Sequence, residues 1–271
     1  MLVSTLLDRL QSDPGRPRLT WYGDDGERVE LSGAVLANWV AKTTNLLVEE
    51  YDAQPGSMVG VNLPVHWRTV TWALAAWRVG ATVVLRDDSR APGEPGATNE
   101  PGPAGEPVTS GTAGPISTEN LDVVVTDSPE RWTASGAELV AVSLPALARR
   151  YDGDLPPGAM DAAAAVMTYA DQVIYAPEPE AGRTALTGAG ADGSPVPAVR
   201  HDELVPEAED GGARVLVDGR GAPADVLREL LRVWAGAGSV VLTSPATAAA
   251  LEVDPARRER LVTTEKIEKI T

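Results

Sequence analysis

The chain has 271 residues, of which 43% are hydrophobic, so it can bury a sizeable core. Its 39 acidic and 23 basic side chains give a net charge of −16, which disfavours a nucleic acid or an anionic membrane as partner. Cysteine is absent, which excludes disulfides, thiolate nucleophiles and cysteine metal sites and favours a cytoplasmic location. Two histidines far apart in the sequence are too few for a metal cage, so no metal site is expected.

The first fifty residues read as helix, hairpin and helix. Apolar residues at helical spacing in 2–10 predict a helix that stops at an Asp-Pro-Gly turn. Two short extended runs, 18–22 and 28–31, flank a Gly-Asp-Asp-Gly turn and predict a hairpin. Ser32 can cap a helix over residues 33–51.

The stretch from residue 58 to residue 85 predicts a strand, a helix and a second strand. Residues 58–63 form an apolar, β-branched run, and Pro64 follows it. Residues 66–79 carry apolar side chains on two faces and end at Gly80, which predicts a helix covered on both sides. Residues 81–85 are again apolar, so the two strands should pair in parallel through a right-handed crossover.

The rest of the chain alternates similar elements with irregular segments. Residues 90–115 are rich in Pro, Gly, Ala, Thr and Glu, which predicts a disordered insertion. We expect strands at 121–126, 138–142, 214–218 and 239–243, a short helix at 145–151, a helix-prone segment at 161–172 and a helix at 222–234. About thirty residues through 188–197 are expected to be irregular, and 253–271 to be a charged tail that adds no core element.

Together these elements predict a single α/β domain over residues 1–271, with a layered parallel or mixed sheet and helices on both faces. Two segments carry a family resemblance, QPGSMVGVNLP at residues 54–64 and AAWRVGATVV at residues 75–84. In this order they resemble the N-terminal part of the adenylate-forming superfamily, which includes acyl-CoA synthetases, luciferases and peptide-synthetase adenylation domains. The chain matches about the first half of that family's large domain, so the resemblance implies a truncated, degenerate member of a kind found in actinobacteria.

The resemblance also implies a phosphate-binding loop of the form T-S-G-T-T-G-x-P-K-G, whose hydroxyls, amides and lysine hold the phosphates of ATP. Residues 109–115, TSGTAGP, look like this motif, but they lie inside the predicted insertion with no strand before them, which indicates a linker. Residues 188–197 fit better by position, with Gly190, Gly193 and Pro195 matching two glycines and the proline of the motif. Val196 stands where the lysine should be, so we interpret this segment as a vestigial phosphate loop.

The same segment meets the pattern G-x-G-x-x-G of dinucleotide-binding folds, but no clean strand precedes it and prolines follow it, so that reading is weak. We therefore expect no catalytic residue, no cofactor and a non-catalytic homologue of the AMP-dependent ligases that serves as a binding or regulatory module. The alternative is one half of a split AMP-forming acid–thiol ligase, which would use ATP, AMP and Mg²⁺ together with a partner chain. An uncovered sheet edge would favour a homo-oligomer or a partner protein that covers it.

Overall fold

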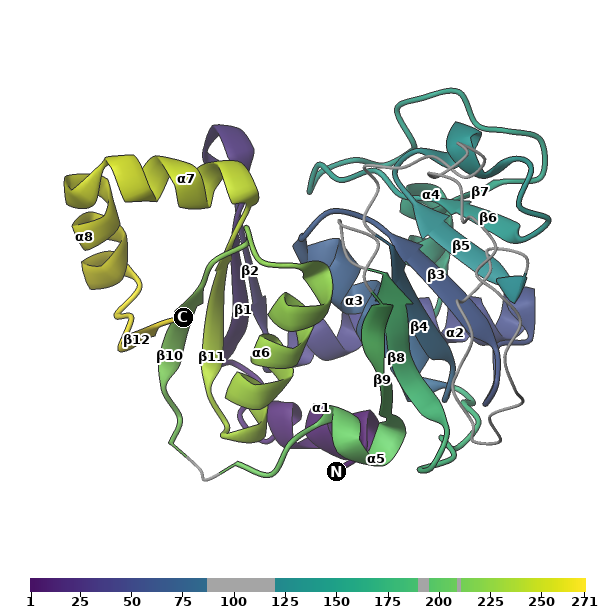
Figure 1. Cartoon of the computed structure of the whole chain (residues 1–271), viewed down its shortest axis with the longest axis horizontal. Helices are drawn as coiled ribbons and strands as arrows, with labels where there is room; N and C mark the ends of the chain where they lie inside the picture. The colour runs from purple at the N-terminus through teal and green to yellow at the C-terminus, as the bar shows by residue number, and fades with distance from the viewer. Residues whose placement is uncertain (87–119, 190–194, 209–210) are drawn as a thin grey trace, which may run out of the picture.

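The structure is a computed structural model that describes residues 1–86, 120–189, 195–208 and 211–271. Within these ranges the chain forms a five-stranded sheet in the order β12-β10-β11-β1-β2 and a seven-stranded sheet in the order β7-β6-β5-β3-β4-β8-β9. Figure 1 shows α6 between the five-stranded sheet and strands β8 and β9. The predicted α/β class is confirmed, with the strands divided between two sheets instead of one.

The five-stranded sheet combines the two ends of the chain. Its elements are α1 (Val3–Gln11), β1 (Pro17–Tyr22), η1 (Asp24–Gly26), β2 (Arg28–Ser32), β10 (Arg214–Val217), α6 (Pro223–Ala235), β11 (Ser239–Thr243), α7 (Pro245–Val253), α8 (Pro255–Thr264) and β12 (Lys269–Ile270). β1 pairs antiparallel with β2, which confirms the predicted hairpin, and parallel with β11. One face of this sheet contributes Leu19, Val215 and Val240 to the main core, which also contains residues of α6.

The opposite face of this sheet carries α7 and α8. Leu216 and Val241 pack there with Leu251 and Leu261. The prediction that residues 253–271 add no core element is therefore wrong, because α8 buries Leu261 and β12 pairs with β10. The segment looked like a tail because α8 shows only one strongly buried apolar residue among charged neighbours.

The seven-stranded sheet contains the central strand–helix–strand unit. Its elements are α2 (Gly33–Tyr51), β3 (Met58–Asn62), α3 (Trp67–Arg78), β4 (Thr82–Arg86), β5 (Val123–Thr126), η3 (Pro129–Trp132), β6 (Glu138–Ala141), β7 (Met160–Asp161), α4 (Ala162–Ala165), η4 (Val166–Thr168), β8 (Thr184–Ala189), β9 (Pro195–Arg200) and α5 (His201–Leu204). β3 and β4 pair in parallel as predicted, and every residue of α3 up to Trp77 is buried. The Ser32 hydroxyl accepts a hydrogen bond from the amide of Val35, which confirms the predicted cap of α2.

Three predictions about the middle of the chain need correction. The segment expected to be irregular contains β8 and β9, which pair antiparallel. Its Gly and Pro content hid these strands, yet β8 buries Leu186 beside β4, and β9 is an edge strand, where proline is tolerated. Residues 145–151 form turns and bends instead of a helix, and 161–172 contain the end of β7 and the short helices α4 and η4 instead of one longer helix. The predicted insertion at 90–115 lies outside the described residues.

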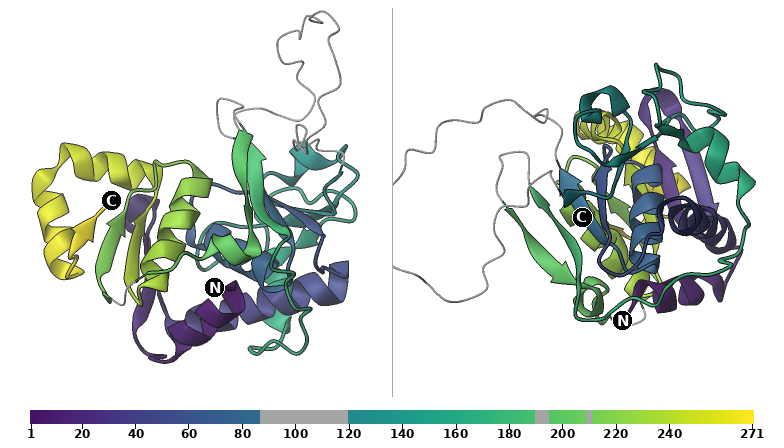
Figure 2. Two further views of the ribbon diagram at one scale, coloured as in Figure 1. Left: turned by 60° about the horizontal axis from the view of Figure 1, so that its bottom comes forward. Right: turned by 90° about the vertical axis from the view of Figure 1, so that its right-hand side faces the viewer.

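Figure 2 shows the N-terminal helix α1 close to α5 in both of its views. The amino group of Met1 donates a hydrogen bond to the carbonyl of Val205, directly after α5, at 3.2 Å. Segments about two hundred residues apart in the sequence therefore meet beside the main core.

Candidate functional site

The predicted phosphate loop joins β8 to β9. Gly190 and Gly193 lie outside the described residues, whereas Pro195 opens β9 and pairs with Ala189 at the end of β8. Because β8 runs parallel to β4 and β3, its carboxyl end lies at the same edge of the sheet as theirs. The loop therefore follows a true strand, contrary to our expectation. The other candidate loop, residues 109–115, lies outside the described residues.

Gly188 and Val196 define the flanks of this loop. A Cβ atom at Gly188 would lie 2.0 Å from the carbonyl oxygen of Leu85, so only glycine fits where β8 passes β4. Val196, the second residue of β9, is partly buried and packs against the main core. An apolar side chain, not a cation, therefore follows Pro195 directly at the start of β9.

A cavity of about 610 Å³ lies between the two sheets, at the carboxyl ends of β1, β3, β6 and β11. We call it the crevice. This edge is where ligands bind in open α/β sheets. The end of β8 is two strands from β3, or roughly 10 Å at the usual strand spacing. The crevice is lined by Trp21, Gly23, Asp24, Gly26, Glu27, Pro64, Val65, His66, Leu144, Pro145, Ser244 and Pro245.

His66 lies in the wall of the crevice and is 5% exposed. It precedes α3, where its Nδ1 accepts a hydrogen bond from the amide of Arg68 at 3.1 Å. Burial, together with the nearby charge of Arg68, lowers the pKa of His66 to about 3. The ring is therefore neutral near pH 7, with its proton on Nε2, which lies 4.0 Å from the Glu27 carboxylate.

Glu27 connects the two sheets across the crevice. Its carboxylate accepts a hydrogen bond from the indole of Trp21 at 3.3 Å and another from the amide of Ala146 at 2.8 Å. Trp21 also packs edge-on against His66, with ring centroids 4.7 Å apart. The carboxylate is thus held by contacts with both sides of the crevice.

Arg68 holds the segment after β6 against α3. Its guanidinium donates to the carbonyls of Leu144, Pro145 and Ala146 and stacks on the ring of Trp67 at 4.3 Å. Burial lowers the pKa of Arg68 to about 10, a value at which it is still charged at pH 7. The segment after β6, which forms one wall of the crevice, is therefore held by Arg68 of α3 and by Glu27 of the β1–β2 hairpin.

The hydroxyl of Ser244, which lines the crevice, makes structural hydrogen bonds. Ser244 donates to the carboxylate of Asp24, and its oxygen caps α7 by accepting from the amide of Thr247 at 3.0 Å. Neither histidine of the chain hydrogen-bonds to it, since His66 Nδ1 accepts from Arg68 and His201 Nε2 contacts the carbonyl of Gly80 at 3.1 Å. The Ser244 hydroxyl is therefore paired with the carboxylate of Asp24 and with no histidine.

The charges that line the crevice are carboxylates. Asp24 and Glu27 contribute them, and Arg68, two residues after His66, faces backbone carbonyls instead of the cavity. An anionic ligand would meet like charge there, whereas a neutral or cationic molecule with an apolar body would not. Within the described ranges no group of three His, Asp or Glu residues could hold a metal ion, and no helix is long and apolar enough to cross a membrane.

Sequence reasoning missed the crevice residues Trp21, Glu27, His66 and Ser244. Each comes from a turn or an element end, and they meet only because the two sheets face each other. The one signal in the sequence was that each position lies at or near the end of a predicted strand. Pro195 does not line the crevice, and Gly190 and Gly193 lie outside the described residues.

Comparisons with known proteins agree on the fold. No family model matches the chain. A TIGR03089 family protein of Mycobacterium tuberculosis is 34% identical over 99% of this chain and 97% of its own length. Among solved structures, a Brucella canis acyl-CoA synthetase matches 93% of this chain with a TM-score of 0.66 and 16% identity.

Two further solved structures are similar over nearly the whole chain. A fatty acid AMP ligase of Legionella pneumophila has a TM-score of 0.61 at 12% identity, and the N-terminal subdomain of Klebsiella oxytoca NpsA has one of 0.57 at 13% identity. This chain spans 46%, 43% and 58% of the Brucella, Legionella and Klebsiella chains, respectively. The predicted resemblance to the N-terminal part of adenylate-forming enzymes is thus confirmed at the level of the fold.

Proposed function

Because this chain belongs to the TIGR03089 family and has the fold of the N-terminal part of acyl-CoA synthetases, we propose that it is a non-catalytic homologue of these ligases that acts as a binding module. The observation that carries the proposal is the packing of Val196 against the main core, because we align this residue with the lysine of the motif. A phosphate loop without that cation loses the charge that offsets a triphosphate.

The side chains that line the crevice also support the proposal. Trp21 and Ala146 hold the carboxylate of Glu27, and Ser244 lies between Asp24 and the amide of Thr247. The crevice therefore has a rigid wall and no nucleophile paired with a histidine base. We propose that the ligand is a small neutral or cationic molecule with an apolar body, held against Trp21 and His66.

An ATP–pyrophosphate exchange assay with a panel of carboxylic acids tests the lack of catalysis. We expect no exchange above a protein-free blank for the purified chain. Exchange that depends on one acid and on Mg²⁺ would overturn the proposal. A Val196→Lys variant is a useful companion, because restoring one cation without the hydroxyls of the motif should not create activity.

The alternative is that the crevice is part of an active site completed by another polypeptide. The observation that favours it is the open cavity at the carboxyl edge, where ligands of α/β folds bind. Capture of partners from native lysate, followed by the exchange assay on the captured complex, distinguishes the two. Exchange that appears only in the complex supports the split ligase, and self-association without exchange supports the binding module.

A further inference from the structure

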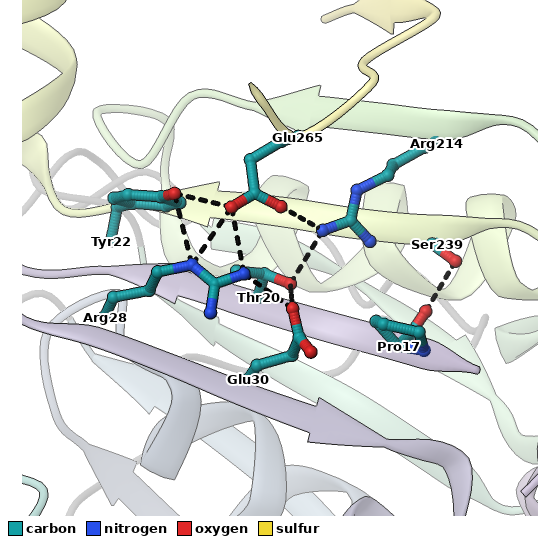
Figure 3. Close-up of polar contacts among 8 residues, drawn as sticks. All are labelled: Pro17, Thr20, Tyr22, Arg28, Glu30, Arg214, Ser239 and Glu265. Carbon is teal, nitrogen blue, oxygen red and sulfur yellow. Dashed lines mark hydrogen bonds and ion pairs between the residues drawn. The ribbon is translucent and has the colours of Figure 1, made fainter. Parts of the chain in front are cut away.

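The outer face of the five-stranded sheet is divided into an apolar half and a polar half. Leu216 and Val241 lie under α7 and α8 in the apolar half. The polar half carries Thr20, Tyr22, Arg28, Glu30 and Arg214, and Figure 3 shows these side chains converging over β1 and β2. Above them lies an open cavity of about 640 Å³, which we call the arginine cavity.

Glu265 forms the floor of the arginine cavity. Its side chain is 5% exposed and accepts hydrogen bonds from Tyr22, from Arg28 at 3.0 Å and from Arg214. Burial favours the neutral form of this carboxyl, but the three donors outweigh burial and hold the pKa of Glu265 below its usual value. The network fixes both guanidinium groups at the edge of the cavity.

Four cations line the arginine cavity in a chain whose net charge is −16. They come from four places in the fold, namely Arg16 before β1, Arg28 on β2, Arg214 on β10 and Lys266 after α8. Arg214 uses Nη2 for Thr20 and Glu265, which leaves its Nη1 and Nε without a hydrogen bond to any described residue. Lys266 is exposed and pairs with no described carboxylate.

Three carboxylates face these cations, those of Glu30, Glu265 and Glu268. Glu268 is held in part by the backbone amide of Arg214 at 3.0 Å, and Glu30 by Arg28 at 2.6 Å. The described lining therefore carries one net positive charge, which suits a small anion of low charge and disfavours a polyphosphate. Cations that approach from several sides fit the acceptors of a tetrahedral oxyanion.

We propose that the arginine cavity binds a small molecule through a single phosphate group. Arg214 and Lys266 donate to the phosphate oxygens, Arg28 is held in position by Glu265, and the rest of the cavity accommodates the remainder of the molecule. This site lies on the outer face of the five-stranded sheet, apart from the crevice, and does not depend on the proposed function.

Calorimetry on the full chain at low salt and pH 7 tests the proposal with two probes, inorganic phosphate and glycerol 3-phosphate, and with glycerol as the neutral control. We expect saturable binding of the anions and none of glycerol. Tighter binding of glycerol 3-phosphate supports an organic phosphate, and equal or tighter binding of phosphate supports the free ion. The absence of saturable binding of either anion would overturn the proposal.

A charge variant tests whether the binding is at this cavity. Lys266→Glu breaks no described contact and should weaken phosphate binding about tenfold or more, because it reverses the net charge of the lining. Lys269→Glu is the matched control, an exposed lysine in β12 that does not line the cavity, and it should leave the affinity nearly unchanged. Equal losses of affinity in the two variants would indicate only non-specific attraction of the anion to positive surface charge and would contradict a site at this cavity.

Discussion

Glu265 joins the C-terminal segment to the five-stranded sheet through a buried carboxylate shared by two arginines and a tyrosine. A Glu265→Gln variant leaves both guanidinium charges partly uncompensated and should lose about 3 kcal/mol of unfolding free energy at pH 7. The exposed pair of Glu252 with Arg220 provides a control, since Glu252→Gln should cost less than about 1 kcal/mol. Urea unfolding of the three proteins measures both changes, and equal losses would contradict the role of Glu265.

The lowered pKa of Glu265 predicts how the stability of the chain depends on pH. Because the pKa of Glu265 is lower in the folded state, its contribution to stability is present above the ordinary pKa of glutamate and is lost as the pH falls through the lowered value. The difference in stability between the native chain and Glu265→Gln should therefore be constant near pH 7 and shrink below about pH 4. A difference that stays constant down to pH 3 would show that the carboxylate charge is not what stabilises the segment.

At the scale of elements, the hairpin of β8 and β9 depends on the close passage of Gly188 over the backbone of β4. Gly188→Ala should cost roughly 3 kcal/mol or more, because the contact of its Cβ with the Leu85 carbonyl forces backbone movement in a buried strand. Gly182→Ala is the control, since nothing lies within 4 Å of a Cβ at that position. Thermal melts of both variants measure the effect, and similar melting temperatures would refute the strain at Gly188.

Sequence patterns predicted the elements that are apolar along most of their length and end at Pro or Gly, such as β3, α3 and β4. They failed for β8 and β9, because pairing with β4 buries Ala185 and Leu186 although neighbouring Gly and Pro residues are typical of loops. They also failed for α8, where one buried leucine and Glu265 provide the tertiary contacts. The crevice could not be predicted, because His66, Glu27 and Ser244 come together only through the packing of one sheet against the other.

At the scale of the whole molecule, the central claim is that a ligase-like fold here lacks the chemistry for holding a triphosphate. Titration calorimetry with ATP and Mg²⁺ tests this claim directly. The account predicts no saturable binding up to about 1 mM nucleotide, because carboxylates line the crevice and the proposed function has Val196 in place of the motif lysine. Saturable binding at about micromolar concentrations that a Gly190→Val variant abolishes, while Gly182→Ala retains it, would contradict the account.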